Sequence, residues 1–481
     1  MSKKKFVPVI IVLALVLALA GVLAACDKTE KEGVFAQAGI PVQDEYGFWG
    51  YVNSAGEEVI PFDYTSATPF DNGTAVVATA KKSYDVPDVD VPDVFYLINS
   101  GGSRIAGPYA YAQLIEGGNY AIVAKAGSSV LSEGDVLYGI YDIGAAAMAK
   151  DFAYSSISWD KEAGVVFAVQ GNFTYVWKAA DLSDVGVRAG AAESGSGSLH
   201  YAYVWIEEAD ATDEFNDYVY QIYDKENFGF TSVSGNVLTD NLGWWCISSD
   251  AADGSGGTVT NYTFVGEKVV TTFPQSDVTD IQTEEGMLLL TVTNAEGGSE
   301  YLLFAANGTQ LYSGTQEPVS DSTSGGFVLE GENGAYTVFA QGLKFSFTLN
   351  AQSTFAGGRI YEDAQTEEVY YGYTYRQEAE DGTISVHMAA IAEDGTSYAF
   401  DPSVFGNKAF GGFVGGNVLV ISAGGRVGIA DKQGNMLVEC IYSDLRALDG
   451  GYYAAKLGSA WGVIKADGTQ LTGFRFADMG V

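Results

Sequence analysis

The sequence of 481 residues is poor in the residue types from which most catalytic and metal sites are built. It has only two histidines, three cysteines and ten prolines. With His200 and His387 alone, a histidine-rich zinc site is excluded, and a Ser-His-Asp triad would have to use one of them. We find no Gly-x-Ser-x-Gly turn, phosphate-binding loop, His-Glu-x-x-His motif or zinc-type cysteine pair. We therefore expect a protein that is not an enzyme and that holds no cofactor and no metal.

Basic side chains are also scarce, because 25 lysines and arginines stand against 61 acidic residues and give a net charge of −36. A strongly acidic surface repels nucleic acid and anionic lipid headgroups, so neither is expected as a partner. Cations, basic peptides and basic proteins are electrostatically allowed. The charge alone selects none of them.

Stretches with helical periodicity are nearly absent, whereas Gly (60) and Tyr (30) are abundant. Short alternating runs end in Gly, Asn, Asp or Ser about every 8–12 residues, which is typical of an all-β domain with many short strands. Cys246 and Cys440 lie in two such apolar runs and are expected to be buried strand residues. Whether they form a disulfide cannot be judged from their positions in the sequence.

The N-terminus carries an export signal. Lys3, Lys4 and Lys5 precede an apolar run at 9–23, which is shorter than the ~20 residues that span a bilayer. The run ends in Leu-Ala-Ala-Cys, with the cysteine at Cys26, and resembles the lipobox of bacterial lipoproteins. The resemblance implies cleavage before Cys26 and lipidation of its thiol. We expect a signal peptide at 1–25, the lipidated cysteine with a short tether at 26–32, one domain at 33–481, and an extracytoplasmic protein anchored to the bacterial cell membrane.

An internal repeat organises the rest of the chain. The clearest copy runs from Phe48 through Trp49-Gly50 to Val77, a second covers 427–455, and a third opens at Trp461. In each, a Gly lies seven residues after the opening aromatic or Val. This spacing predicts a strand, a tight turn that needs the positive φ of Gly, and a returning strand. A further Gly then precedes a third strand of small apolar residues.

These copies resemble the WG repeats, also called KWG repeats, of bacterial proteins. The resemblance implies an aromatic-Gly opener, a turn Gly, and a final Phe-x-x-Gly-x-Ala-x-Val segment. Between the clear copies the motif is degenerate, and several openers follow from spacing alone. We place these weaker openers at Phe95, Tyr138, Tyr175, Val219, Tyr262, Tyr301, Tyr336 and Met388. With the clear copies, this gives roughly eleven units.

The two ends of the chain carry complementary fragments. The last unit stops at Val481 before a full third strand, and Gly33-Val34-Phe35-Ala36-Gln37 matches that missing strand. Pairing of the N-terminal strand with the C-terminal unit would close a ring and remove exposed sheet edges. We therefore predict a single closed, β-propeller-like toroid. An open β-solenoid is the alternative, and the blade number stays open because degenerate units can merge.

Several insertions are expected to project as acidic loops, among them 85–93, 207–217, 362–368 and 378–382. Two aromatic clusters could form a platform for a sugar or peptide ligand. They comprise Trp244, Trp245, Tyr370, Tyr371, Tyr373 and Tyr375. Packing in the core of the repeats is the alternative explanation of both clusters.

Taken together, these features favour a membrane-anchored, non-enzymatic module that binds a protein or another macromolecule. A glycan-binding protein, or a glycoside hydrolase that uses a carboxylate pair, is the second hypothesis. A structural component of the cell envelope is the third. The WG resemblance implies a module more than an activity, and the ligand and the oligomeric state stay undetermined.

Overall fold

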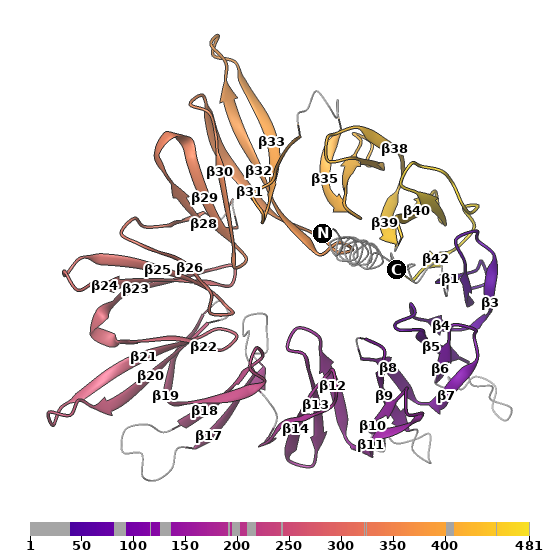
Figure 1. Cartoon of the computed structure of the whole chain (residues 1–481), viewed down its shortest axis with the longest axis horizontal. Helices are drawn as coiled ribbons and strands as arrows, with labels where there is room; N and C mark the ends of the chain where they lie inside the picture. Colours follow the sequence, from indigo (N-terminus) through magenta and orange to yellow (C-terminus); the bar gives the residue numbers. More distant parts are fainter. Residues whose placement is uncertain are drawn as a thin grey trace, which may run out of the picture.

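The computed structural model describes most of the chain beyond the N-terminal segment. The described residues are 39–80, 93–115, 117–125, 136–190, 193–194, 203–208, 218–241, 244–321, 323, 325–400, 408–448 and 450–480. They form ten antiparallel sheets that stand in a ring around a common centre (Figure 1). The fold is therefore an all-β propeller, as expected. Among the described residues we find no helix long and apolar enough to cross a bilayer.

Most blades are four-stranded, and we number them from the N-terminus. Blade 1 has the strand order β3-β2-β1-β42, blades 2 to 4 comprise β4–β7, β8–β11 and β12–β15, and the seven-stranded blade 5 comprises β16–β22. Blades 6 to 9 comprise β23–β26, β27–β30, β31–β34 and β35–β38, and blade 10 comprises β39–β41.

The strand bounds in blades 1 to 4 are β1 Ile40–Gln43, β2 Trp49–Val52, β3 Glu58–Tyr64, β4 Ser66–Ala67, β5 Thr74–Thr79, β6 Val94–Asn99, β7 Arg104–Tyr109, β8 Tyr111–Leu114, β9 Tyr120–Lys125, β10 Leu137–Asp142, β11 Ala147–Tyr154, β12 Ser156–Asp160, β13 Val165–Gln170, β14 Phe173–Lys178, β15 Asp184–Ala189 and β42 Asp478–Met479. Those in blades 5 and 6 are β16 Glu193–Ser194, β17 Tyr203–Glu208, β18 Tyr218–Asp224, β19 Gly229–Asn241, β20 Trp244–Ala252, β21 Thr258–Val265, β22 Val269–Pro274, β23 Val278–Glu284, β24 Met287–Thr293, β25 Ser299–Ala305 and β26 Gln310–Gly314.

Those in blades 7 to 10 are β27 Val319–Asp321, β28 Gly326–Glu330, β29 Ala335–Ala340, β30 Leu343–Thr348, β31 Ser353–Asp363, β32 Glu368–Glu378, β33 Ile384–Ala392, β34 Ser397–Phe400, β35 Ala409–Val414, β36 Asn417–Ile421, β37 Val427–Ala430, β38 Met436–Tyr442, β39 Asp444–Leu448, β40 Tyr452–Leu457 and β41 Ala460–Lys465. Two short 3₁₀ turns, η1 Gln275–Asp277 and η2 Glu332–Gly334, complete the described elements.

Blade 5 is double. The first half of the long strand β19 pairs with β18 and its second half pairs with β20, so the strand belongs to two four-stranded units at once. The change of partner occurs at Gly235, whose φ is 146°. With this blade counted twice, the ring holds eleven units, of which blade 10 has three strands and the others four. Eleven is about the number that the spacing of the sequence repeat predicts.

Several neighbouring blades are joined by very short connections. At Thr65, Ala110, Ser155 and Ser443 the outer strand of one blade runs through this single residue into the inner strand of the next, which lies nearer the centre of the ring (Figure 1). At Thr65, Ala110 and Ser155 the backbone N–H of this joining residue donates to the second strand of the new blade, at 2.9, 2.9 and 2.8 Å. The repetition of this bond gives these junctions the same strand register.

The hydrophobic core lies between neighbouring units of the ring, which are separate blades except for the two halves of blade 5. Val76 and Leu97 of blade 2 pack with Ala121 and Val123 of blade 3, and every other core cluster likewise joins two neighbouring four-strand units. Second and third strands are accordingly buried on both faces. Such strands are read in sequence as nearly continuous apolar runs.

All eleven predicted openers lie in the third strand of a four-strand unit. Trp49 begins β2, Val427 begins β37 and Trp461 lies in β41. The sequence repeat therefore starts on the outer half of one blade and ends on the inner half of the next. This offset between repeat and blade could not be read from the sequence.

The repeat glycines have two distinct physical roles. The turn glycines, such as Gly56 and Gly434, have φ values of 76° and 87°, which side chains rarely adopt. The glycine of the aromatic-Gly pair is required for space instead. A Cβ on Gly50 or Gly428 would lie 2.8 or 2.4 Å from a carbonyl oxygen of the next strand.

The ring is closed by the two ends of the described chain. Strand β42 pairs with β1 through Val42–Met479 and Gln43–Asp478, and thus supplies the inner strand of the blade that β1 to β3 build. The predicted pairing of the N-terminal strand with the C-terminal unit is confirmed, and the open solenoid is not formed. The strand that pairs is Ile40–Gln43, however, whereas the predicted segment 33–37 lies outside the described residues.

Replacing the glycine of an aromatic-Gly pair should destabilise the ring. In Gly428→Ala the new methyl group meets the Val438 carbonyl oxygen at 2.4 Å, so the backbone of β37 or β38 must shift. We expect the free energy of unfolding to fall by about 1–3 kcal/mol. Gly424→Ala is the matched control, because no atom lies within 4 Å of its Cβ position. Equal denaturation midpoints for the two variants would contradict the close-approach explanation.

Candidate binding surfaces

The predicted aromatic platform lies almost entirely in the core. The side chains of Trp244, Trp245, Tyr370, Tyr371 and Tyr373 are all buried. Trp244 packs at the boundary of blades 5 and 6, and Trp245 lies between the two halves of blade 5. The structure therefore does not bring the two clusters together on one surface. Their burial agrees with the core-packing explanation, and we do not propose a platform from them.

The tyrosines of β32 are divided between its two faces. Tyr370 stacks on Phe413 of blade 9 with ring centroids 3.7 Å apart. Tyr373 stacks on Phe347 of blade 7 at 4.0 Å. Only Tyr375 is partly exposed, and it stacks on His387, whose Nε2 lies 2.8 Å from the Ser385 hydroxyl. His387 is thus held by strand neighbours and has no carboxylate among its described contacts.

A pocket of about 570 Å³ lies next to the ring closure, and we call it the closure pocket. Its walls come from blades 1, 2, 8, 9 and 10, at the inner ends of their strands. The lining is mostly apolar, with Glu362, Asp363 and Arg446 as the charged exceptions. The lining residues are Gly39, Ile40, Pro41, Pro69, Phe70, Glu362, Asp363, Ala364, Gln365, Phe413, Val414, Arg446, Ala447 and Leu448.

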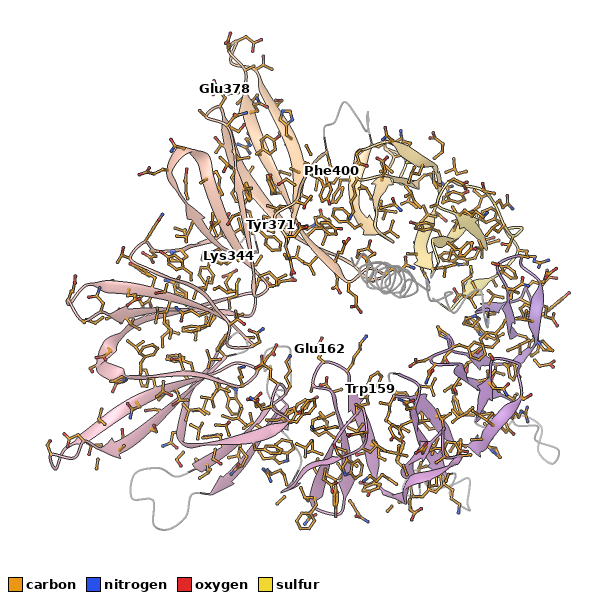
Figure 2. All side chains as sticks on the ribbon, viewed as in Figure 1. Trp159, Glu162, Lys344, Tyr371, Glu378 and Phe400 are labelled. Atoms are coloured by element: carbon orange, nitrogen blue, oxygen red, sulfur yellow. The ribbon has the colours of Figure 1, made fainter. Side chains whose placement is uncertain are left out.

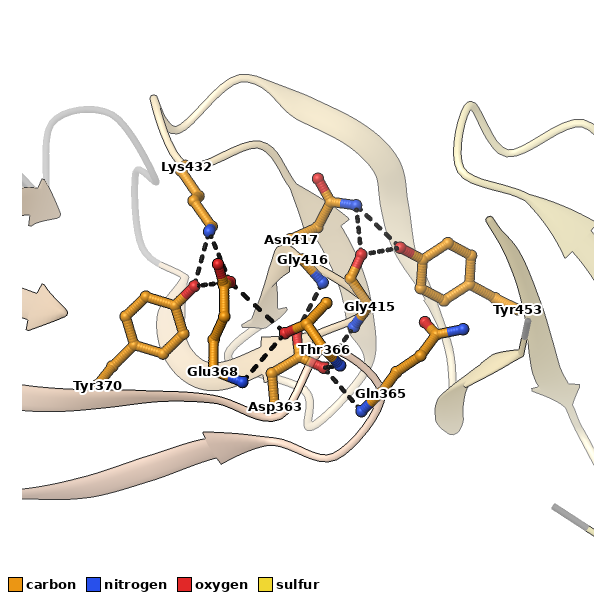
Figure 3. Close-up of polar contacts among 10 residues, drawn as sticks. All are labelled: Asp363, Gln365, Thr366, Glu368, Tyr370, Gly415, Gly416, Asn417, Lys432 and Tyr453. Carbon is orange, nitrogen blue, oxygen red and sulfur yellow. Dashed lines mark hydrogen bonds and ion pairs between the residues drawn. The ribbon is translucent and has the colours of Figure 1, made fainter. Parts of the chain in front are cut away.

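One side of the closure pocket is the turn between β31 and β32, which was predicted to project as an acidic loop. Instead this turn reaches toward the centre of the ring and contacts blade 9 (Figure 3). The Asp363 carboxylate is 1% exposed and accepts the backbone N–H groups of Gly415 at 3.0 Å and Gly416 at 2.6 Å. Gln365 donates its side-chain amide to the carbonyl of Leu448 in blade 10. Asp363 is therefore buried and Gln365 half-buried, against the expectation of a projecting acidic loop, whereas the other residues of 362–368 are exposed.

A second polar contact joins the same hairpin to blade 9. The Lys432 ammonium lies 3.1 Å from the Glu368 carboxylate and donates to the Tyr370 hydroxyl at 2.6 Å (Figure 3). The hydrogen bond from Tyr370, followed by that from Lys432, lowers the pKa of Glu368. Burial raises the pKa of Tyr370 to about 12. The lysine is thus held as a cation, and the contact acts as an ion pair between blades.

A second hollow, of about 500 Å³, lies where hairpin turns of blades 4 to 7 converge, and we call it the acidic hollow. Its carboxylates are Glu162, Glu267 and Glu285, which come from blades 4, 5 and 6. Figure 2 shows Glu162 at the central opening of the ring. Glu162 and Glu285 are exposed, whereas Glu267 is paired with Lys225. Asn307 and Gln341 add neutral polar groups to the wall.

Sequence reasoning missed both the acidic hollow and the burial of Asp363. Glu162 precedes the other two glutamates by more than a hundred residues along the chain. Each follows a strand at a hairpin turn, so their common place at the centre depends on the order of the blades. A comparison of the turns after the first and third strands of each unit could have found them, once the register of the degenerate copies was known.

The carboxyl groups with clearly shifted pKa values give no support to the glycoside hydrolase hypothesis. In the described residues these shifts are downward, at Asp181, Asp224, Asp253, Glu368, Asp381, Asp394, Asp431 and Asp467. At Asp381 the hydroxyl and the backbone N–H of Thr383 lower the pKa. A general acid for this chemistry needs a raised pKa, so these eight groups do not supply one.

Other predicted features lie partly or wholly outside the described residues. They include Cys26, the signal segment, His200, loop 207–217 and most of loop 85–93. Cys246 and Cys440 are both free thiols, and burial raises the pKa of each. Within the described ranges, no group of three or more His, Cys, Asp or Glu side chains is arranged to hold a metal ion.

A family model for the WG-containing repeat matches residues 49–82 and 428–461. The chain therefore carries WG repeats. The first match runs from β2 of blade 1 to just beyond β5 of blade 2, and the second from β37 of blade 9 into β41 of blade 10. Each WG match thus spans the junction of two blades. No curated protein matches the sequence of the chain.

Two solved structures illustrate what the WG-repeat ring is similar to. One, described as a crystal structure of the eukaryotic initiation factor, is 9% identical, covers 76% of this chain and 96% of its own, and has a TM-score of 0.28. The other, the β-propeller domain of the Trilobed protease from Pyrococcus furiosus, is 8% identical, covers 69% and 93%, and has a TM-score of 0.23. The propeller assignment rests on the ring of sheets in this chain itself.

Removal of the Asp363 carboxylate should loosen the contact between blades 8 and 9. Asp363→Ala leaves the half-buried N–H groups of Gly415 and Gly416 without their acceptor. We expect the free energy of unfolding to fall by about 2–4 kcal/mol, measured by chemical denaturation. Asp381→Ala is the control, because that exposed aspartate accepts only from its own turn and should change stability by less than about 1 kcal/mol. If the free energy of unfolding falls no more than in the control, the Asp363 carboxylate does not stabilise the contact between blades 8 and 9.

Proposed function

We propose that this WG-repeat propeller is a non-enzymatic binding protein held at the outer face of a bacterial cell membrane by a lipid on Cys26. The WG-repeat propeller fold suggests a repeat-based binding module. We further propose that the acidic hollow is the surface that meets a macromolecular partner, and that the partner presents basic side chains there. Fold alone implies no activity, so the proposal rests on the site.

The observation that carries the proposal is the convergence of turns from four successive blades on one hollow of about 500 Å³. Glu162 and Glu285 are exposed there and come from different blades, so a partner would contact several repeats at once. Charges within about 8–10 Å of one another act jointly at physiological ionic strength. A net charge of −36 strengthens the attraction of a basic partner toward this centre.

Lipid anchoring is supported by the sequence of the N-terminus. Its basic head, apolar run and Leu-Ala-Ala-Cys box are followed by polar residues at 27–32. Removal of Lys3, Lys4 and Lys5 with the signal would change the net charge from −36 to −39. A protein of that charge is repelled by anionic headgroups, so stable residence at the membrane needs a covalent lipid.

Lipidation is tested by labelling the full-length protein in a bacterial host with a radioactive fatty acid. We expect the wild-type chain to incorporate label and to lose residues 1–25, because Cys26 is both the cleavage point and the acceptor. Cys26→Ser should incorporate no label, because serine has no thiol to form the thioether with the lipid. Cys440→Ser is the control and should be labelled like the wild type. Label retained in Cys26→Ser, or a mature N-terminus at another residue, would contradict lipid anchoring through Cys26.

Partner binding is tested by capture from envelope extract at about 150 mM salt, near physiological ionic strength, with the lipid-free Cys26→Ser protein as bait. In the double variant Glu162→Gln/Glu285→Gln we expect the amount of captured partner to fall about tenfold. This corresponds to a loss of about 1.4 kcal/mol of binding free energy. Glu378→Gln/Glu380→Gln removes the same charge from the tip of the β32–β33 hairpin and should leave capture unchanged. Equal losses in both variants would indicate non-specific charge attraction. No capture by any bait would favour the structural role.

A further inference from the structure

We propose that a small pocket between the second half of blade 5 and blade 6 binds a small uncharged molecule of about the size of one six-membered ring, whose oxygen accepts a hydrogen bond from the Trp244 indole N–H. We call it the tryptophan pocket. Its volume is about 120 Å³, and its lining residues are Trp244, Trp245, Cys246, Phe264, Ile281, Thr283 and Leu288. The inference goes beyond the binding function proposed above and does not depend on it.

The walls of the tryptophan pocket come from two neighbouring units of the ring. Strands β20 and β21 of blade 5 supply Trp244, Cys246 and Phe264. Strands β23 and β24 of blade 6 supply Thr283 and Leu288, which are paired across the two strands. Trp244, Cys246, Phe264 and Leu288 also belong to one hydrophobic cluster. The pocket is therefore a gap in the core between the two units, and it differs from the exposed aromatic platform that the sequence suggested.

The Trp244 side chain carries an unpaired polar group in this core. It is only 2% exposed, and its indole N–H has no hydrogen-bond acceptor among the described residues. An indole N–H can only donate, and a buried donor without an acceptor is unfavourable because it has lost its hydrogen bond to water. An acceptor oxygen on a bound molecule would restore that hydrogen bond. The unpaired N–H is thus the observation that assigns an acceptor to the ligand.

The lining of the pocket favours an uncharged ligand. None of its described lining residues is acidic or basic. Burial raises the pKa of the Cys246 thiol to about 11, so this group is also neutral at physiological pH. A charged molecule would lose its hydration in the pocket without gaining an ion pair, which is strongly unfavourable.

The size of the pocket suits a single ring. A cavity of about 150 Å³ lined by leucine, isoleucine and phenylalanine is large enough to bind benzene. The 120 Å³ of the tryptophan pocket come close to that volume. The rings of Trp244 and Phe264 offer flat aromatic surfaces, and an apolar ring gains free energy when it leaves water for such walls.

The pocket is reached past Ile281. This side chain is 36% exposed, whereas Phe264 and Leu288 are almost completely buried. Ile281 pairs with Leu290, which belongs to the same hydrophobic cluster as Trp244, so it lies on the face of β23 that is turned toward blade 5. A larger side chain at position 281 would narrow the entrance and leave the buried walls unchanged.

The tryptophan pocket adjoins the acidic hollow but shares no described lining residue with it. Between them, the backbone N–H of Glu267 donates to the Ala306 carbonyl oxygen at 2.7 Å, and Ala306 packs in the cluster of Trp244. A molecule in the pocket would leave Glu162 and Glu285 accessible to a partner. The two proposals therefore concern separate surfaces, and either can fail without the other.

The test follows the seven tryptophan indole N–H signals of the lipid-free Cys26→Ser protein by nuclear magnetic resonance. Cyclohexanone is the probe, and its control is methylenecyclohexane, which has a CH2 group in place of the carbonyl oxygen. We expect cyclohexanone to shift the signal that is absent from Trp244→Phe, and to bind about tenfold more tightly than methylenecyclohexane. In Trp244→Phe the two probes should bind about equally, because phenylalanine has no N–H to donate. Equal affinities of the two probes for the unsubstituted pocket, or no shift of the Trp244 signal, would overturn the proposal.

Trp205 provides a matched control inside the same molecule. Its indole is 1% exposed and its N–H is also unpaired among the described residues, but it does not line the pocket. The signal that is absent from Trp205→Phe should therefore stay in place when cyclohexanone is added. A shift as large as that of Trp244 would show non-specific binding and contradict the assignment of the pocket.

A second variant tests the entrance without removing the indole. In Ile281→Trp we expect cyclohexanone to bind at least about tenfold more weakly, because the larger side chain closes the way into the pocket. Ile384→Trp is the control, since Ile384 is 63% exposed on β33 of blade 8. This variant should bind the probe as the unsubstituted protein does. Undiminished binding in Ile281→Trp would place the ligand elsewhere, and it would leave the proposed function unaffected.

Discussion

Burial of both faces of the blades is the constraint on which the rest of this structure depends. Each core cluster joins two neighbouring units of the ring, and none is confined to one unit. A unit at the end of an open array would leave such a face in water, and a sheet edge with it. Closure removes that cost, because the cluster of Ile40, Val42, Trp461 and Met479 joins the last blade to the first. The two-residue strand β42 can therefore close the ring although it forms few hydrogen bonds itself.

The same constraint explains how much of the fold could be predicted from the sequence. Turn glycines such as Gly56 and Gly434 need a positive φ, and Gly50 and Gly428 face a strand too close for a side chain. These local requirements set a spacing that is kept where the aromatic opener is absent, so even Val219 lies in the same strand of its unit as the clear openers. The offset of the repeat from the blade, and the position of the closing strand, depend on pairing between distant segments. Local spacing carries no information about such pairing.

Prediction of the site was less successful for a related reason. In a strand buried on both faces, consecutive tyrosines pack in opposite directions, as Tyr370 and Tyr371 do toward blades 9 and 7. An aromatic cluster in the sequence is then a sign of two cores rather than of one exposed platform. In the acidic segment 362–368 the error was the opposite one, because exposure was expected whereas Asp363 is buried. Its carboxylate accepts hydrogen bonds from backbone N–H groups. Composition describes the residues of a turn, whereas their solvent exposure depends on whether that turn points into or out of the ring.

Specific function in a repeat ring must come from the features that the repeats do not share. The hairpin of β31 and β32 has strands of 11 residues each, and its turn contacts blades 9 and 10 in addition to its own. The acidic hollow likewise depends on glutamates in single turns of blades 4, 5 and 6, while the glycines around them follow the common pattern. Turn side chains can change without cost to the inter-blade cores, because they lie outside the buried faces of the sheets. The scaffold and the binding surface are therefore under separate physical constraints, and the WG motif alone cannot specify a partner.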